Sequence, residues 1–432
     1  MAIGIELHGI AQRHPDGDVT LHRPGRAGGR GVEVLVPGEL AERHRIATGD
    51  VVAGPTAPIE HTAHDRAGDR PGTDLPAWLC LRPTPTEALL AVAAINGLPL
   101  PAADDRPPPR SRRTAFDRLP PSRPIPLARG PKDITGRVLD LAAPLVAGAA
   151  GLVHGPHGTG LTRTLQAVAA GAAAQPNLAV IVLLLRARSE EITAWRRFLP
   201  QADVVAAPSP YAGATALETL RTAELTLQCA QRQTELGRDV LVAIDSLTGL
   251  WASLLELEEA DAQRESDRAA ARHSVRDWIQ RAGAFSAEGF LGSGLGGSLT
   301  IVAAAWNQEI DAEAEEEGES HPHLRLIEHV LNDTDWRVPL SGRLAARRLY
   351  PAVDIAGCIS PLDNADGPAG MARREALLVL REMDPLKRHA TLLEALEAGD
   401  SPEALLDLLP CAAPQTASRF DLILPLLPGT DD

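Results

Sequence analysis

Hydrophobic and polar positions alternate in short runs over the first hundred residues. Segments 4–10, 18–23 and 32–37 mix apolar and polar residues with a period near two, and Gly, Pro and Asp separate them from each other and from the apolar segment 78–84. This period is typical of half-buried strands, and several such strands in succession predict a small barrel. We therefore expect an OB-like β-barrel domain over residues 1–104.

The pattern then changes twice. Residues 105–131 are so rich in proline and arginine that neither a helix nor a strand ladder is expected, which predicts a stiff linker. Beyond it, helical periods at 133–145 and 214–237 and a helix from Thr162 alternate with continuous apolar runs at 151–155, 178–185, 239–246 and 297–305. Fully apolar strands joined by helices predict an α/β core with a parallel sheet, here assigned to residues 132–365.

The last part of the chain is helical in pattern. Residues 372–410 show helical spacing with a break expected at Gly399. We assign residues 366–432 to a C-terminal helical cap.

Composition and charge narrow the function. The 432 residues carry a net charge of −15, the wrong sign for a protein whose whole surface binds nucleic acid, so any RNA site must be local. Four scattered cysteines form no CxxC pair, which argues against a disulfide framework or a zinc site and fits a reducing cytoplasm. No apolar run is long enough to span a bilayer, so we expect a cytoplasmic protein without a membrane partner.

One glycine-rich stretch carries the candidate chemistry. It lies between an apolar strand and a helix and consists of Gly155, Pro156, His157, Gly158, Thr159, Gly160, Leu161 and Thr162. This pattern matches a phosphate-binding loop except that leucine stands where the lysine belongs. Backbone N–H groups and the helix N-terminus can still hold phosphate, and the Thr162 hydroxyl can bind Mg²⁺.

The loop alone also fits an ordinary glycine-rich turn of an α/β protein. Asp245 favours the phosphate-loop interpretation, because a carboxylate at the end of an apolar strand is where the metal-ordering acid of such a site lies.

Four groups of segments, in chain order, resemble the bacterial transcription termination factor Rho, a hexameric RNA-dependent ATPase. They are "RVLDLAAPL" with "GLVHGPHGTGLTRTLQ", "VLLLRARSEEITAW", "GRDVLVAIDSLTGL", and "GGSLTIVAAA" with "RRLYPAVDI". The segment "VEVLVPGELAERHRIATGDVVAGP" also resembles that family's RNA-binding barrel. The resemblance implies a RecA-like core, ATP and Mg²⁺ as cofactors, and assembly into a ring.

The chain departs from the family at the positions that perform catalysis. The family's second core strand runs into Asp-Glu-Arg-Pro-Glu-Glu, whose first Glu orients the attacking water, whereas this chain has Ala187 there. Leu161 replaces the lysine that grips phosphate, and Gly249 replaces a basic residue four positions after Asp245. Arg163 could reach back to a phosphate, and Glu190 could act as a relocated carboxylate.

Other residues of the family's nucleotide pocket are retained. The resemblance assigns Tyr350 to adenine stacking, Arg348 and Arg188 to the surroundings of the nucleotide, and Arg373 to the arginine finger that acts across a subunit interface. Tyr350 is equally interpretable as a core aromatic before a proline. The insertion 356–371 precedes Arg373 and alters its setting.

The residues expected to contact RNA match the family less well than the residues expected to contact the nucleotide. The family stacks bases on aromatic residues in its barrel, whereas "DGDVTLHRP" offers Val19, Leu21 and His22. Segments 256–278 and 307–323, which match the loops of the ring channel, are acidic. They are interpretable as solvated segments or as a protein-docking surface, and either way they repel phosphate.

Two functions from different classes follow. The first is a catalytically impaired Rho-family ring protein that binds ATP and Mg²⁺ weakly, binds RNA weakly or not at all, and associates with itself or with a catalytic Rho. The alternative is an active, RNA-stimulated translocase that uses Arg163 and Glu190.

Overall fold

A computed structural model describes residues 7–14, 17–22, 33–59, 85–100, 102–105, 118–121, 123–212, 215–260, 275–285, 297–306, 330–364 and 368–398. By its internal contacts the chain divides into one unit over Met1–Leu362 and a second over Asp363–Asp432. The domain boundaries expected from the sequence stay predictions. Segment 78–84, most of the linker, the acidic segment 307–323 and the break at Gly399 lie outside the described residues.

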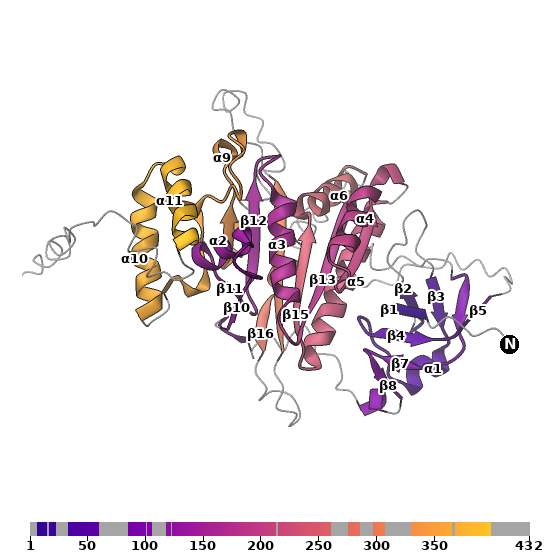
Figure 1. The fold of residues 1–432 in the computed structure, drawn as a ribbon. Coiled ribbons are helices and arrows are strands. Elements are labelled where there is room, and N and C mark those ends of the chain that lie inside the picture. Colours follow the sequence, from indigo (N-terminus) through magenta and orange to yellow (C-terminus); the bar gives the residue numbers. More distant parts are fainter. Residues whose placement is uncertain are drawn as a thin grey trace, which may run out of the picture. The chain divides into compact units, whose positions relative to one another are not determined.

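The N-terminal part of the first unit is an OB-like barrel (Figure 1). β1 pairs antiparallel with β2 and β4, β2 pairs antiparallel with β3, and β3 pairs in parallel with β6. Helix α1 (Gly38–Arg43) lies between β3 and β4 in sequence. The strands are β1 (Leu7–Arg13), β2 (Val19–His22), β3 (Glu33–Val36), β4 (Val51–Gly54), β5 (Thr56–Pro58), β6 (Glu87–Leu89), β7 (Ala94–Ile95) and β8 (Leu98–Pro99).

The main sheet of the RecA-like core is parallel and runs in the order β14-β13-β15-β17-β12-β18. Its four central strands are largely buried, as expected for a parallel sheet with both faces covered, whereas the edge strands β14 and β18 are partly exposed. The strands of this sheet are β12 (Ala150–Gly155), β13 (Leu178–Ala187), β14 (Asp203–Pro208), β15 (Asp239–Asp245), β17 (Ser298–Trp306) and β18 (Trp336–Pro339). β16 (Gly283–Phe285) pairs antiparallel with β17 and with β9 (Arg118–Leu119), while β10 (Pro124–Ile125) and β11 (Leu145–Val146) form a separate two-stranded sheet.

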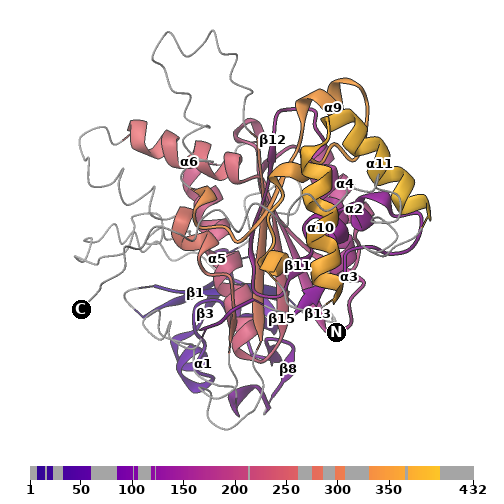
Figure 2. The same cartoon turned by 90° about the vertical axis from the view of Figure 1, so that its left-hand side faces the viewer.

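Helices cover both faces of this sheet. Figure 2 shows α5 and α6 on one side of the sheet and α2, α3 and α4 on the other. Alternate residues of β13 serve the two faces, with Ile181, Leu183 and Leu185 packing toward α5 and α6. The helices are α2 (Ile134–Ala142), α3 (Leu161–Ala173), α4 (Ser189–Phe198), α5 (Ala216–Glu235), α6 (Leu247–Ala260) and α9 (Gly342–Ala346).

Helix α5 begins with a capping box. Thr215 accepts a hydrogen bond from the backbone N–H of Glu218, whose carboxylate accepts one from the N–H of Thr215. The sequence pattern predicted this helix.

The second unit contains α10 (Pro368–Glu382) and α11 (Pro385–Ala398). The helical run therefore breaks before Pro385, a break that the sequence analysis did not place, because proline lacks the N–H that a continuous helix needs there. Arg388 stabilises the junction by donating to the carbonyl oxygens of Leu380, Arg381 and Met383.

Candidate functional site

The candidate residues gather at the carboxyl edge of the parallel sheet. Gly155 at the end of β12 lies opposite Trp306 of β17, and Asp245 of β15 lies between Ala304 of β17 and Leu184 of β13. Ligands of open α/β sheets bind at this edge, beyond the ends of the strands. The register therefore brings the glycine loop, Asp245 and the end of β13 to one place.

The glycine loop has the backbone that a phosphate loop needs. Gly158 and Gly160 have φ angles of 81° and 96°, which favour glycine, and Gly160 is the N-cap of α3. Thr159 closes the loop by donating from its hydroxyl and its N–H to the carbonyl oxygen of Pro156. Helix α3 begins at Leu161, and the backbone N–H groups of its first turn are suited to binding an anion. The nest is present without the lysine.

Thr162 and Asp245 lie next to each other. Burial raises the pKa of the Asp245 carboxyl above its usual value, and its interaction with the Thr162 hydroxyl opposes that rise. A hydroxyl and a carboxylate are oxygen ligands of the kind that Mg²⁺ prefers, with nucleotide phosphates and water completing its shell. The donor set therefore fits a nucleotide-bound Mg²⁺.

The positions that depart from the family pattern have no catalytic group. Ala187 is 7% exposed and offers only a methyl group. The preceding residue, Arg186, forms an ion pair of 2.6 Å with Glu256 of α6. A Cβ added at Gly249 would lie 2.6 Å from the carbonyl oxygen of Leu185, so this backbone has no room for the family's basic side chain. Neither position therefore carries the side chain that the resemblance to Rho leads us to expect there.

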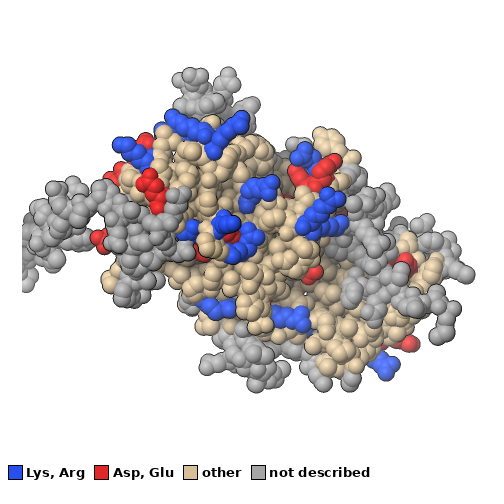
Figure 3. All heavy atoms as spheres, viewed as in Figure 1, with Lys and Arg blue, Asp and Glu red and all other residues tan. Residues whose placement is uncertain are grey.

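Tyr350 lies over the glycine loop. Its hydroxyl donates to the carbonyl oxygen of Gly158 at 3.1 Å, and its ring would lie 3.8 Å from a Cβ at Gly160. The side chain is 51% exposed, so it stands at the surface rather than in the core. Neighbouring Arg348, Arg343 of α9 and Arg347, which caps the end of α9, are also exposed. Figure 3 shows Lys and Arg side chains gathered on the surface over α9.

The two residues of the alternative function are both exposed. Arg163 contacts Gln166, one turn further along α3, at 3.4 Å. Glu190 is in the first turn of α4, where Arg188 pairs with Glu191 at 2.9 Å. Arg188 is thus engaged with its own helix.

Arg373 lies in the C-terminal unit and is 7% exposed. Its guanidinium pairs with Asp363 of the same unit, with 2.6 Å between Nη2 and Oδ1. The insertion that precedes it therefore supplies a carboxylate partner to the residue that the family resemblance assigns as a finger.

The sequence analysis placed His157 in the glycine loop but missed its aromatic neighbour Trp306. The imidazole of His157 contacts the indole of Trp306 in a tilted arrangement, with ring centroids 4.3 Å apart and ring planes inclined by 36°. One signal could have indicated Trp306, because a large side chain directly after an apolar parallel strand lies at the ligand-binding edge. No signal in the sequence pairs it with His157.

Residues 136–360, a little over half of the chain, match the nucleotide-binding domain of the ATP synthase alpha/beta family. This match defines the class of the core. Among solved structures, the chain is similar to an ATPase of a type III secretion system from pathogenic bacteria, at 15% identity, covering 63% of this chain and 83% of that chain, with a TM-score of 0.48.

Curated relatives narrow the class. A transcription termination factor Rho of Streptosporangium roseum is 30% identical over 359 residues and covers 81% of each chain. One from Streptomyces coelicolor is 27% identical over 426 residues, covering 95% of this chain and 86% of its own. The chain spans 50% of a third, from Micrococcus luteus, at 29% identity over 91% of this chain. The chain belongs to the Rho family.

Among the described residues, no helix is long and apolar enough to cross a membrane.

Proposed function

We propose that this chain is a ring-forming Rho-family protein, linked to transcription termination, that binds ATP and Mg²⁺ weakly and does not hydrolyse ATP at a rate useful to a motor. One observation carries the proposal. At the carboxyl edge of the sheet, the nest and the Thr162–Asp245 pair are kept, while Leu161, Ala187 and Gly249 replace the groups that would grip phosphate and orient water.

Magnitudes favour impairment over slow activity. The loss of a positioned acid–base group costs about 10²–10⁴ in rate. The loss of one preorganised charge on a transferring phosphoryl group costs about 10²–10³. Groups that act as a unit are not additive, so the two losses need not multiply. The smaller loss alone, about 10²-fold, lowers a median turnover of about 10 s⁻¹ to about 0.1 s⁻¹, below the ordinary range of about 1–10³ s⁻¹.

Weak nucleotide binding is supported by what remains around the loop. The positive end of α3 favours phosphate whatever the side chains are. Tyr350 offers an exposed ring beside the loop, and Arg348 stands two residues before it. Without the lysine, the charge of the phosphates is balanced less completely, which lowers the affinity.

The partner role rests on family membership. Rho assembly into a ring gives each subunit a neighbour, so a chain without catalytic groups can still occupy a place in a ring. We infer self-association or association with a catalytic Rho as its main activity.

The alternative, an active translocase, has a specific observation in its favour. Arg163 and Glu190 are exposed and therefore able to move. Such a protein would add RNA-stimulated ATP hydrolysis to any mixture that contains it.

Titration into a catalytic Rho separates these functions. Increasing amounts of this protein are added to a fixed amount of a Rho that carries both the lysine and the glutamate, and RNA-stimulated ATP hydrolysis is measured. We expect hydrolysis to fall as mixed rings form. A rise with added protein would establish the active alternative, and an unchanged rate with no mixed complex by mass would refute the partner role.

Arg373 needs a matched variant in this experiment. Arg373→Glu would place an acid beside Asp363 and could disrupt the C-terminal unit by itself. The exchange Asp363→Arg with Arg373→Asp keeps the ion pair while removing the arginine from position 373. If Arg373 contacts a neighbouring subunit, the exchange weakens the mixed complex while circular dichroism stays native, because repulsion at such an interface costs several kcal/mol.

A further inference from the structure

The outer face of the barrel strands packs against helix α5 of the core. Along β2, Val19 and Leu21 point into the barrel core, while Thr20 and His22 alternate with them and point outward. Thr20 and His22 are nevertheless only 4% and 8% exposed. The outward side of these strands is therefore covered by protein.

The centre of this contact is apolar and close. Ile10 of β1 and Val51 of β4 pack with Leu225 and Cys229 of α5. A Cβ at Gly49, whose φ is 92°, would lie 2.7 Å from the carbonyl oxygen of Gln228 in α5. The barrel backbone thus approaches the helix backbone as closely as only glycine allows.

A buried ion pair closes one end of the contact. Arg221 of α5 donates to both carboxylate oxygens of Glu33 at 2.8 and 3.3 Å and to the Gln12 side chain at 2.7 Å. His22 contacts the same carboxylate at 2.8 Å and the Thr222 hydroxyl at 3.5 Å. Arg221 and Glu33 are 4% and 6% exposed. Strands β1, β2 and β3 all contribute to this cluster.

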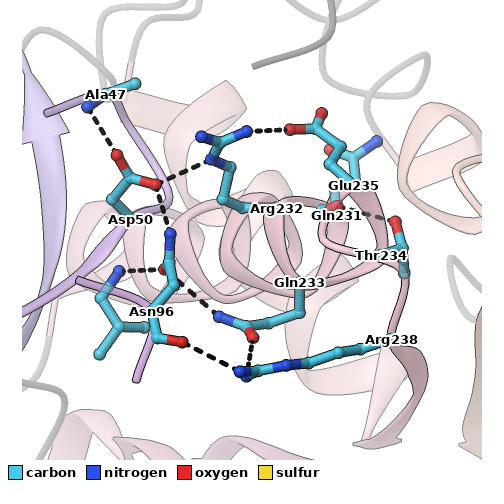
Figure 4. A network of polar contacts seen from close by, with 10 residues as sticks. Ala47, Asp50, Asn96, Gln231, Arg232, Gln233, Thr234, Glu235 and Arg238 are labelled. Carbon is cyan, nitrogen blue, oxygen red and sulfur yellow. Dashed lines mark hydrogen bonds and ion pairs between the residues drawn. The ribbon is translucent and has the colours of Figure 1, made fainter. Parts of the chain in front are cut away.

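A second network closes the other end (Figure 4). Arg232 of α5 donates to Asp50 at 2.8 Å, and the Asn96 amide donates to the same carboxylate at 2.7 Å. Gln233 donates to the Asn96 side chain at 3.3 Å, and Arg238 donates to the Asn96 carbonyl at 3.1 Å. Asp50, Asn96 and Arg232 are at most 2% exposed. The polar groups of the contact are therefore paired across it.

The barrel face and helix α5 are complementary along the length of their contact. Residues Arg221, Thr222, Leu225, Cys229, Arg232 and Gln233 recur at helical spacing and form one stripe of α5. The barrel presents Glu33 opposite the first arginine and Asp50 opposite the second. Buried charges persist only when they are paired, so this complementarity selects α5 as the occupant of the face.

In OB-type barrels the face of the second and third strands binds oligonucleotides. We propose that in this protein the outer face of β1–β3 is an intramolecular docking surface for helix α5 and is closed to RNA. This inference goes beyond the proposed function, because the contact between the barrel and α5 can be measured without following nucleotide hydrolysis.

Cys229 is a natural probe of the docked state. It lies at the centre of the contact and is 7% exposed, and burial raises the pKa of its thiol to about 12, which keeps it unreactive. Cys358 is 1% exposed within the core, away from the barrel strands, and its Sγ contacts the carbonyl oxygen of Asp354. Alkylation of Cys358 therefore reports opening of the core, while alkylation of Cys229 reports undocking as well.

The experiment follows alkylation of Cys229 and Cys358 by peptide mass mapping in the full chain, using wild type, Arg221→Ala, the conservative Arg221→Lys, and Arg197→Ala as an exposed control. We expect Arg221→Ala to accelerate Cys229 at least about tenfold, the factor that about 1.4 kcal/mol of docking free energy gives. Cys358 should be accelerated much less than Cys229, Arg221→Lys should lie between wild type and Arg221→Ala, and Arg197→Ala should have no effect.

A second experiment uses the wild-type protein alone and tests whether RNA reaches the face of β1–β3. A saturating pyrimidine-rich single-stranded RNA should leave Cys229 alkylation unchanged and should not crosslink to β1–β3 under ultraviolet light. Fast alkylation of wild-type Cys229, alkylation accelerated by RNA, or RNA crosslinks on β2 and β3 would each overturn the proposal.

Discussion

At the scale of single residues, His154 makes stability depend on pH. It precedes the glycine loop on β12, where burial and the nearby charge of Arg337 lower its pKa to about 4 from the ordinary 6.5. Above pH 6.5 it is neutral in both the folded and unfolded states. Between pH 6.5 and 4 only the unfolded chain takes up the proton, so the free energy of unfolding falls as pH falls.

The expected loss from His154 over this window is at most about 3 kcal/mol. Urea unfolding at pH 7 and pH 4.5 measures it, with His154→Gln removing this part of the pH dependence. His157→Gln, which removes an exposed histidine three residues away, is the matched control and should leave the dependence intact. Equal pH dependence in wild type and His154→Gln would contradict this assignment.

Residues in the glycine loop could be predicted from the sequence because the motif is contiguous. Leu161 and Ala187 stand out against a known pattern, and their lack of a functional group follows from residue type alone. The pairing of Arg186 with Glu256 and of Arg373 with Asp363 could not be predicted, because each partner comes from another element or from an insertion. The close approach of Gly249 to Leu185 likewise depends on packing between a helix and a strand.

At the scale of elements, helix α5 is buried on two faces. One packs on the sheet through Leu220, Ala223, Leu227 and Ala230, and the other holds the barrel through the two arginine clusters. Helical periodicity predicted the helix and its apolar face. It could not predict that the polar face is buried, since arginine and threonine on a helix are ordinarily solvated.

Removing one member of a buried ion pair leaves the other charge unpaired. We expect Arg221→Ala to lower the free energy of unfolding by about 3–5 kcal/mol, because Glu33 stays buried. Arg188→Ala, which breaks an exposed pair, should cost at most about 1 kcal/mol. Urea unfolding of both variants measures the difference. A cost for Arg221→Ala as small as that for Arg188→Ala would show that the cluster is not buried in solution.

At the scale of the whole molecule, charge opposes nucleic acid. The net charge is −15, and the outer face of β1–β3 is occupied by α5. We expect pyrimidine-rich single-stranded RNA to bind more weakly than about 10⁻⁶ M at physiological salt, with a shallow dependence on salt because few counterions are released. Fluorescence anisotropy over a salt series tests this. Submicromolar affinity with a steep salt slope would contradict it.

The architecture of the chain was predictable because it depends on repeated patterns. Apolar strands separated by helices define the parallel core, and short alternating segments define the barrel. How the barrel and core join was not predictable, since it rests on Asp50, Asn96 and Arg232, three polar residues far apart in sequence.

The most direct test of impaired catalysis is steady-state ATP hydrolysis by the purified protein, with and without single-stranded RNA. We expect a rate of at most about 0.1 s⁻¹, with no stimulation by RNA, because no side chain grips the transferring phosphate or orients the attacking water. Leu161→Lys alone should not restore turnover, since Ala187 still offers no group to orient water. RNA-stimulated turnover of about 1 s⁻¹ by the unmodified protein would show that its catalysis is not impaired.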